Sequence, residues 1–193
     1  MELKRIATLI ASGAAVVAGV LGLFGAFLKH LVPPVSSLSP LQALGLASLA
    51  SLLLLFLVVL KLPARPSSVE RHRLAAVAAK VGLGALVLLF IHMWAMNTFV
   101  FAYPPAELGT PELHVRGTYT SYAKKLIHEM TLSGAIRESG GLEKAEENEI
   151  LWTEESRKNI ELMLTASYTV SIALFSLSLF ILVVTAISAR RAQ

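Results

Sequence analysis

The chain has 193 residues, of which 55% are hydrophobic and only 16% are charged, with a formal net charge of +4. A soluble domain carries roughly 25% charged residues, and the deficit here comes from long uncharged runs, so we expect an integral membrane protein. Cysteine is absent, which excludes disulfides, thiolate metal sites, iron–sulfur clusters and a catalytic cysteine.

Four long apolar runs, of which only the third contains a charged residue (Lys80), predict four transmembrane helices, at residues 6–28, 41–60, 74–103 and 164–188. Each run reaches the ~20 residues that cross ~30 Å of hydrocarbon, and in lipid the backbone must satisfy its own hydrogen bonds by forming a helix. Prolines mark two boundaries. Pro40 follows Ser39 at the start of the second run, and Pro104 with Pro105 ends the third.

Basic residues predict the orientation of these spans. They precede the first span, lie between the second and third, and follow the fourth: Lys4, Arg5, Lys61, Arg65, Arg71, Arg73, Arg190 and Arg191. The positive-inside rule therefore places both termini in the cytoplasm and residues 104–163 outside it. We expect the first run to be a span rather than a cleaved signal peptide, because it exceeds the typical apolar region of about 7–15 residues and lacks an Ala-x-Ala site.

Residues 104–163 are predicted to form a small extracytoplasmic helical cap, inserted into a single membrane domain over residues 1–193. The segment holds eleven of the thirteen glutamates and seven basic residues. Apolar spacing predicts a helix over 119–136, with Gly140 and Gly141 as its C-cap, and then a short charged helix. Thr153 is predicted to cap a helix that continues to Ser188. Alternatively, the 119–136 helix lies flat on the lipid interface.

His92 stands inside the third run, and an ionisable side chain in a membrane helix is by default a functional-site hypothesis. Met96 follows four residues later on the same helix face, so the two are candidate ligands for haem or copper. No other span has a mid-membrane histidine to pair with it. We therefore favour a neutral imidazole that is hydrogen-bonded to a serine, a threonine or a carbonyl group.

Two further patterns concern the faces of the helices. The first run carries small residues at fourfold spacing, which let another helix approach closely, within the chain or in a partner: Ala14, Ala18, Gly22 and Ala26. The fourth run places hydroxyl groups seven residues apart on one face: Ser171, Ser178 and Thr185. Such hydroxyls either bond carbonyls of their own helix or line a pore.

Motifs for catalysis or nucleotide binding are missing from the sequence. The pair His128-Glu129 does not extend to HExxH, because Leu132 stands where the second histidine belongs. No acidic residue lies in any span, which argues against a carboxylate-driven transporter. We therefore predict a non-catalytic subunit that assembles with other membrane proteins through its small-residue faces and charged cap, without a nucleic-acid partner. The alternatives are a homo-oligomeric channel lined by the fourth span, and a redox subunit that uses His92 with haem, copper or quinone.

Overall fold

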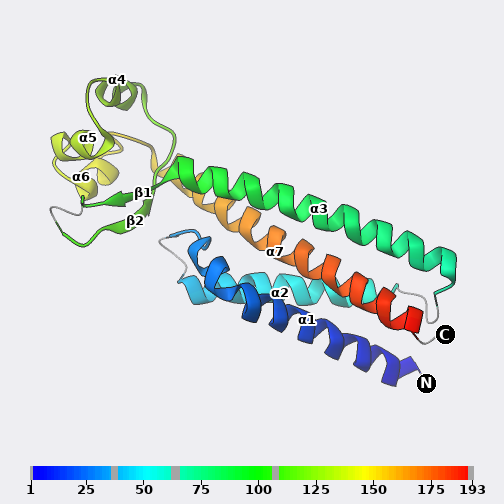
Figure 1. Ribbon diagram of the computed structural model, residues 1–193. Helices are drawn as coiled ribbons and strands as arrows, with labels where there is room; N and C mark the ends of the chain where they lie inside the picture. Colours follow the sequence, from blue (N-terminus) through cyan, green and yellow to red (C-terminus); the bar gives the residue numbers. More distant parts are fainter. Residues whose placement is uncertain (1, 36–38, 62–65, 106–108, 191–193) are drawn as a thin grey trace. The chain divides into compact units, whose positions relative to one another are not determined.

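The computed structural model describes residues 2–35, 39–61, 66–105 and 109–190, which are mostly helical (Figure 1). Helices and strands follow one another along the chain as α1 (Glu2–His30), α2 (Pro40–Val59), α3 (Ser68–Phe99), β1 (Val100–Tyr103), β2 (Glu112–Val115), α4 (Ser121–Glu129), α5 (Leu132–Glu138), α6 (Leu142–Glu147) and α7 (Glu154–Arg190). Pro40 is the first residue of α2, as its position after Ser39 predicts.

Three of the described helices are long and apolar enough to cross a membrane. They are α2, α3 and α7, with candidate spans at Leu41–Val59, Ser68–Phe99 and Glu154–Ala189. The first predicted span is helical throughout as part of α1, and the apolar segment found there, Ala7–Val20, is shorter than these three. The protein is therefore mostly helical, and three of its described helices could cross a membrane.

The structure corrects both ends of the third predicted span. Helix α3 begins six residues early at Ser68, because Ser67 and Glu70 form a capping box. The Ser67 backbone N–H donates to Glu70 Oε2 at 2.7 Å, and the Glu70 N–H donates to Ser67 Oγ at 3.3 Å. The helix ends at Phe99 rather than near Tyr103.

A two-stranded antiparallel sheet follows, and it departs from the all-α prediction. Strand β1 pairs with β2 in a register that sets Val100 opposite Val115 and Tyr103 opposite Glu112. The residues of β1 are β-branched and aromatic apart from one alanine, and Pro104 disfavours the helical conformation for the residue before it. Hydropathy alone does not separate such a short apolar strand from the end of an apolar helix.

The predicted 119–136 helix is divided into α4 and α5. Thr120 caps α4 by accepting the Ala123 N–H at 3.1 Å, and Thr131 caps α5 by accepting the Gly134 N–H at 3.2 Å. The second threonine cap, at Thr131, therefore ends one helix and starts another, although the apolar spacing continues through it. The intervening residue, Met130, has an extended backbone.

The predicted glycine C-cap and the predicted threonine cap of the last helix are confirmed. Gly140 and Gly141 have φ angles of +87° and +104°, and the Gly141 N–H donates to the Ile136 carbonyl at 2.9 Å. This arrangement is a Schellman motif. Thr153 Oγ1 accepts the Ser156 N–H at 3.2 Å and opens α7, which continues for 37 residues.

The chain forms two compact units. Unit 1 comprises Met1–Val32, Pro40–His92 and Ser167–Gln193, and unit 2 comprises Pro33–Ser39 and Met93–Ala166, so α3 and α7 contribute to both. The core of unit 1 is formed by apolar side chains from α1, α2, α3 and α7. The core of unit 2 gathers around Ile136, Leu151 and Trp152, with a second cluster around Ala95, Val115 and Leu164.

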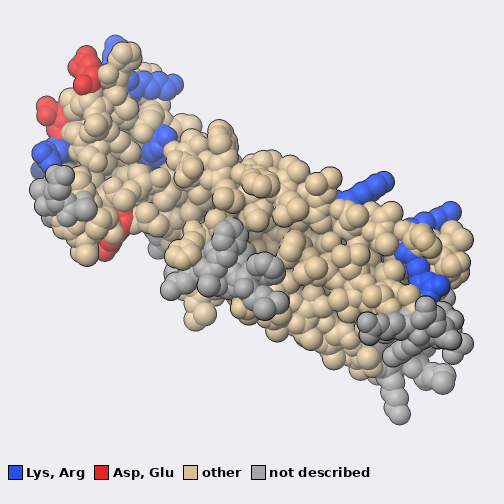
Figure 2. All heavy atoms as spheres, in the orientation of Figure 1, with Lys and Arg blue, Asp and Glu red and all other residues tan. Residues whose placement is uncertain are grey.

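Charged side chains are distributed differently in the two units. On the face drawn in Figure 2, unit 2 carries both acidic and basic side chains. In unit 1 the visible surface is mainly uncharged, and Lys and Arg gather toward the end at which Figure 1 places both termini. On this face, unit 1 therefore has the mainly uncharged surface that helices able to cross a membrane require.

Candidate functional site

His92 is fully buried in unit 1 and contacts two other segments of that unit. Its Nε2 atom lies 2.8 Å from the carbonyl oxygen of Leu31, directly after α1, and its Nδ1 atom lies 2.9 Å from Ser167 Oγ on α7. The imidazole ring also packs against the ring of Tyr168, with centroids 5.7 Å apart. His92 therefore links α3 to α7 and to the end of α1.

The partners of His92 determine its tautomer. A carbonyl oxygen can only accept a hydrogen bond, so Nε2 carries the proton that is donated to Leu31. In the neutral ring, Nδ1 then accepts the hydroxyl proton of Ser167. Both ring nitrogens are engaged in this arrangement, so the histidine is satisfied without a ligand.

Met96, the second candidate ligand, belongs to unit 2. There it packs with the cluster formed by Ala95, Val115 and Leu164. Among the described residues, no group of three or more histidine and glutamate side chains is placed to hold a metal ion. The hydrogen-bonded interpretation of His92 accounts for its burial, and binding of haem, copper or quinone stays a prediction.

The three hydroxyls of the fourth span all donate hydrogen bonds to backbone carbonyls within unit 1. Ser171 Oγ donates to the carbonyl of Ser167 at 2.6 Å, and Thr185 Oγ1 donates to that of Ile181 at 2.7 Å, each four residues back on the same helix. Ser178 Oγ instead donates to the Ala78 carbonyl on α3 at 2.9 Å. Ser171 and Ser178 are buried, so these two hydroxyls face the interior of the unit.

Helices α3 and α7 approach closely where Ser178 reaches α3. A Cβ atom added at Gly82 would lie 2.7 Å from Ser178 Oγ and 3.5 Å from its Cβ. Ala78 and Ala85, which flank this glycine on the same face, are 0% and 2% exposed. A run of small residues therefore lets α7 pack against α3. The spacing of these small residues (78, 82, 85) is visible in the sequence, although the predicted close-packing face lay on the first span.

Helix α1 packs within its own chain through a different face from the predicted small-residue face. Helix α1 packs inward through Gly13, Val17 and Val20. A Cβ atom at Gly13 would lie 3.4 Å from Leu55, and both valines are 4% exposed. Ala14, Ala18 and Gly22 are exposed, and a Cβ atom added at Gly22 would meet nothing within 4 Å. The side chain of Ala26, the fourth predicted member, is outside the described set.

Arg116 organises the end of α3 within unit 2. Its guanidinium Nη2 donates to the Thr98 carbonyl at 2.6 Å, and its backbone N–H donates to the Phe99 carbonyl at 2.9 Å. The guanidinium also lies 4.2 Å from the centroid of the Tyr119 ring. Burial raises the pKa of the Tyr119 phenol, and the Arg116 charge opposes that rise. Arg116 thereby satisfies a carbonyl that helix termination leaves open.

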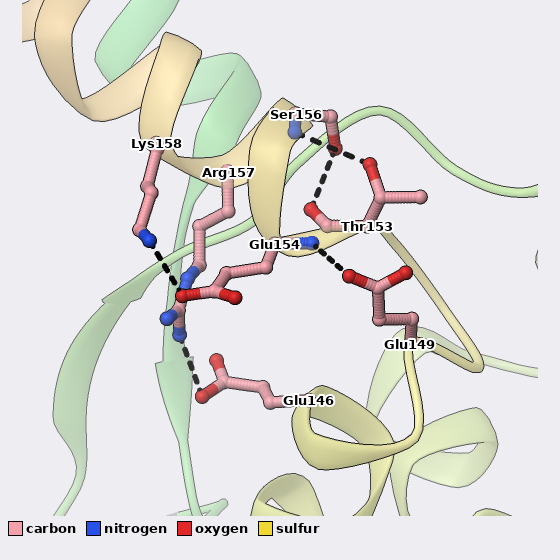
Figure 3. Close-up of polar contacts among 7 residues, drawn as sticks. All are labelled: Glu146, Glu149, Thr153, Glu154, Ser156, Arg157 and Lys158. Carbon is pink, nitrogen blue, oxygen red and sulfur yellow. Dashed lines mark hydrogen bonds and ion pairs between the residues drawn. The ribbon is translucent and has the colours of Figure 1, made fainter.

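The start of α7 carries the acidic part of the predicted charged cap (Figure 3). Arg157 forms an ion pair with Glu146 at 2.7 Å, and Glu149 Oε1 accepts the Glu154 N–H at 3.0 Å. A cavity of about 300 Å³ lies here, lined by Glu143, Glu146, Glu147, Glu149, Trp152, Glu154 and Arg157. Glutamates outnumber the single arginine of this lining, so the surface is acidic.

Comparisons of the chain with protein-family models, with curated proteins and with solved structures find no match in any of the three.

Proposed function

We propose that the protein is a non-catalytic integral membrane subunit that docks onto another membrane protein through the small-residue face of α1. The observation that carries this proposal is the exposure of Ala14, Ala18 and Gly22, while α1 packs within its own chain through Gly13, Val17 and Val20. The face that the sequence selects for close helix packing is therefore available to a partner.

The physical reason lies in how helices associate in lipid. Hydrocarbon tails are as apolar as leucine side chains, so association depends on close van der Waals packing rather than on the hydrophobic effect. Small side chains on the exposed face of α1 let a second backbone approach closely, whereas they bring no advantage against lipid. Ala11 and Ala15 are exposed beside this face and widen it.

The proposal includes four transmembrane helices, with α1 as the first. Its length of 29 residues corresponds to about 43 Å, enough to cross ~30 Å of hydrocarbon. Both termini and the loop after α2 then lie in the cytoplasm, since Lys and Arg gather at that end of unit 1 (Figure 2). Residues 104–163 form the extracytoplasmic cap, whose acidic surface at the start of α7 offers a second contact for a basic partner.

The geometry of unit 1 gives less support to the two alternatives. A pore lined by the fourth span needs hydroxyls that face a water-filled lumen, but Ser171 and Ser178 are buried and bonded within the unit. Ligation of haem or copper needs a free nitrogen on His92, and both nitrogens have hydrogen-bond partners.

Native purification with mass measurement tests the proposal. We expect the wild-type chain to co-purify with a different membrane protein, and A14L/A18L to lose roughly tenfold in affinity for it, because leucines hold the backbones apart. The control is G45L, which adds a leucine at an exposed small residue of α2 inside the candidate span Leu41–Val59 and should keep the partner. A wild-type complex that contains only copies of this chain would contradict the proposal and favour the channel.

A further inference from the structure

One face of α3 in unit 1 combines a lysine with a shallow apolar groove, which is formed by side chains of this one helix and is largely open to its surroundings. The groove has a volume of about 560 Å³ and is lined by Lys80, Leu83, Gly84, Val87, Leu88 and Ile91. The described residues of unit 1 leave this side of α3 uncovered, since Leu83 is 64% exposed and Ile91 52% exposed. A Cβ atom added at Gly84 would meet nothing within 4 Å, so the middle of the groove is open.

The position of Lys80 along α3 matches the edge of a bilayer. Between Lys80 and the end of the helix at Phe99 lie 19 uncharged residues, 81–99, which correspond to about 28 Å and so just cross ~30 Å of hydrocarbon. Lys80 therefore lies at the boundary toward the helix N-terminus. Side chains of a helix lean toward that terminus, so the ammonium extends toward the lipid headgroups while its stem covers apolar surface.

Along this face the cations come first and the apolar residues follow, which matches the order of headgroup and acyl chain in a phospholipid. Arg73, Lys80 and Val87 are seven residues apart and lie on one side of the helix, with both cations exposed. The groove runs from Lys80 to Ile91 over about 16 Å, close to the ~15 Å thickness of one leaflet. No hydrogen-bond or ion-pair partner of Lys80 is found in the part of the chain that the structure describes.

We infer that this face binds one anionic phospholipid, with its phosphate group at Lys80 and an acyl chain in the groove up to Ile91, while the charge of Arg73, about 10 Å further along the helix, adds to the attraction. Charge complementarity selects an anionic lipid over a zwitterionic one, because each cation near the surface attracts the net negative headgroup. The inference rests on the proposed membrane placement of α3, although it does not depend on a protein partner at α1.

Native mass spectrometry of the purified full chain in detergent tests the inference, with phosphatidylglycerol and phosphatidylcholine of identical acyl chains as probes. We expect one tightly bound phosphatidylglycerol on the wild type, and a loss of affinity of about fivefold for each cation removed in R73Q/K80Q. Binding of phosphatidylcholine should change little in that variant. G84W fills the groove and should weaken the binding of both lipids.

The control K124Q/K125Q removes the same charge from two exposed lysines of α4 and should keep the preference for phosphatidylglycerol. A preference that survives in R73Q/K80Q, or that falls equally in the control, would overturn the inference. A photo-cross-linker on V87C should label lipid. Labelling of a partner protein from V87C would mean that a helix covers this groove, which would also overturn the inference while leaving docking at α1 intact.

Discussion

Replacing Gly117 with alanine is expected to destabilise unit 2 by about 3 kcal/mol. The added Cβ atom would clash with Ser156 Oγ and would lie 2.9 Å from the backbone nitrogen of Arg157 and 3.1 Å from Trp152 Cβ. The serine hydroxyl can rotate away, but the backbone of α7 and the buried tryptophan cannot move without disturbing the core. Urea unfolding in detergent, followed by Trp152 fluorescence in a W94F background, measures the change, because the chain has two tryptophans.

Gly134→Ala provides the matched control in the same unit. A Cβ atom there makes ordinary contacts, at 3.4 Å from Thr131 Oγ1 and 3.5 Å from Met130 Cβ. Because alanine favours a helix over glycine by about 1 kcal/mol, this variant should be as stable as the wild type or more stable. Equal unfolding midpoints for the wild type and G117A would contradict the close packing of Gly117 against α7.

Replacing His92 with alanine is expected to destabilise unit 1 by about 3 kcal/mol. The variant loses both hydrogen bonds of the imidazole, leaves the Leu31 carbonyl without that donor and opens a cavity beside Tyr168. Hydrogen bonds between membrane helices average only about 0.6 kcal/mol, so most of the loss comes from the cavity. Unfolding in increasing concentrations of a denaturing detergent, followed by circular dichroism, measures it.

Two further variants separate these contributions. H92F keeps most of the ring volume but cannot bond Leu31 or Ser167, so it should lose less stability than H92A. S167A removes one partner and should cost about 0.6 kcal/mol. If all three variants were as stable as the wild type, His92 would not be the polar link between α3, α7 and the end of α1.

Sequence reasoning predicted the helices where composition alone decides the outcome. Apolar runs of sufficient length indicated α2, α3 and α7, and cap residues such as Thr153 and the Gly140-Gly141 pair located helix ends. The prediction was wrong where the same apolar pattern fits two different local structures. Val100–Tyr103 is as apolar as the helix before it, yet it pairs with β2. Thr131 divides a helix whose apolar spacing continues on both sides.

The candidate site required distances that a sequence does not contain. The spacing of Ala14, Ala18 and Gly22 indicated a packing face, but only the structure shows that this face of α1 is exposed. The hydrogen-bond partners of His92, at Leu31 and Ser167, are 61 and 75 residues away along the chain. Such partners follow from how the helices pack, which local spacing does not predict.

Photo-cross-linking from A18C in native membranes tests the docking of α1 most directly. Because the chain has no cysteine, a benzophenone maleimide attached at this position reports on a single site. The proposed docking predicts a cross-linked product that contains a different membrane protein from A18C, and none from the control F90C, at an exposed position in the middle of the 81–99 segment of α3. Labelling of lipid alone from both positions, or a product that holds only two copies of this chain, would contradict it.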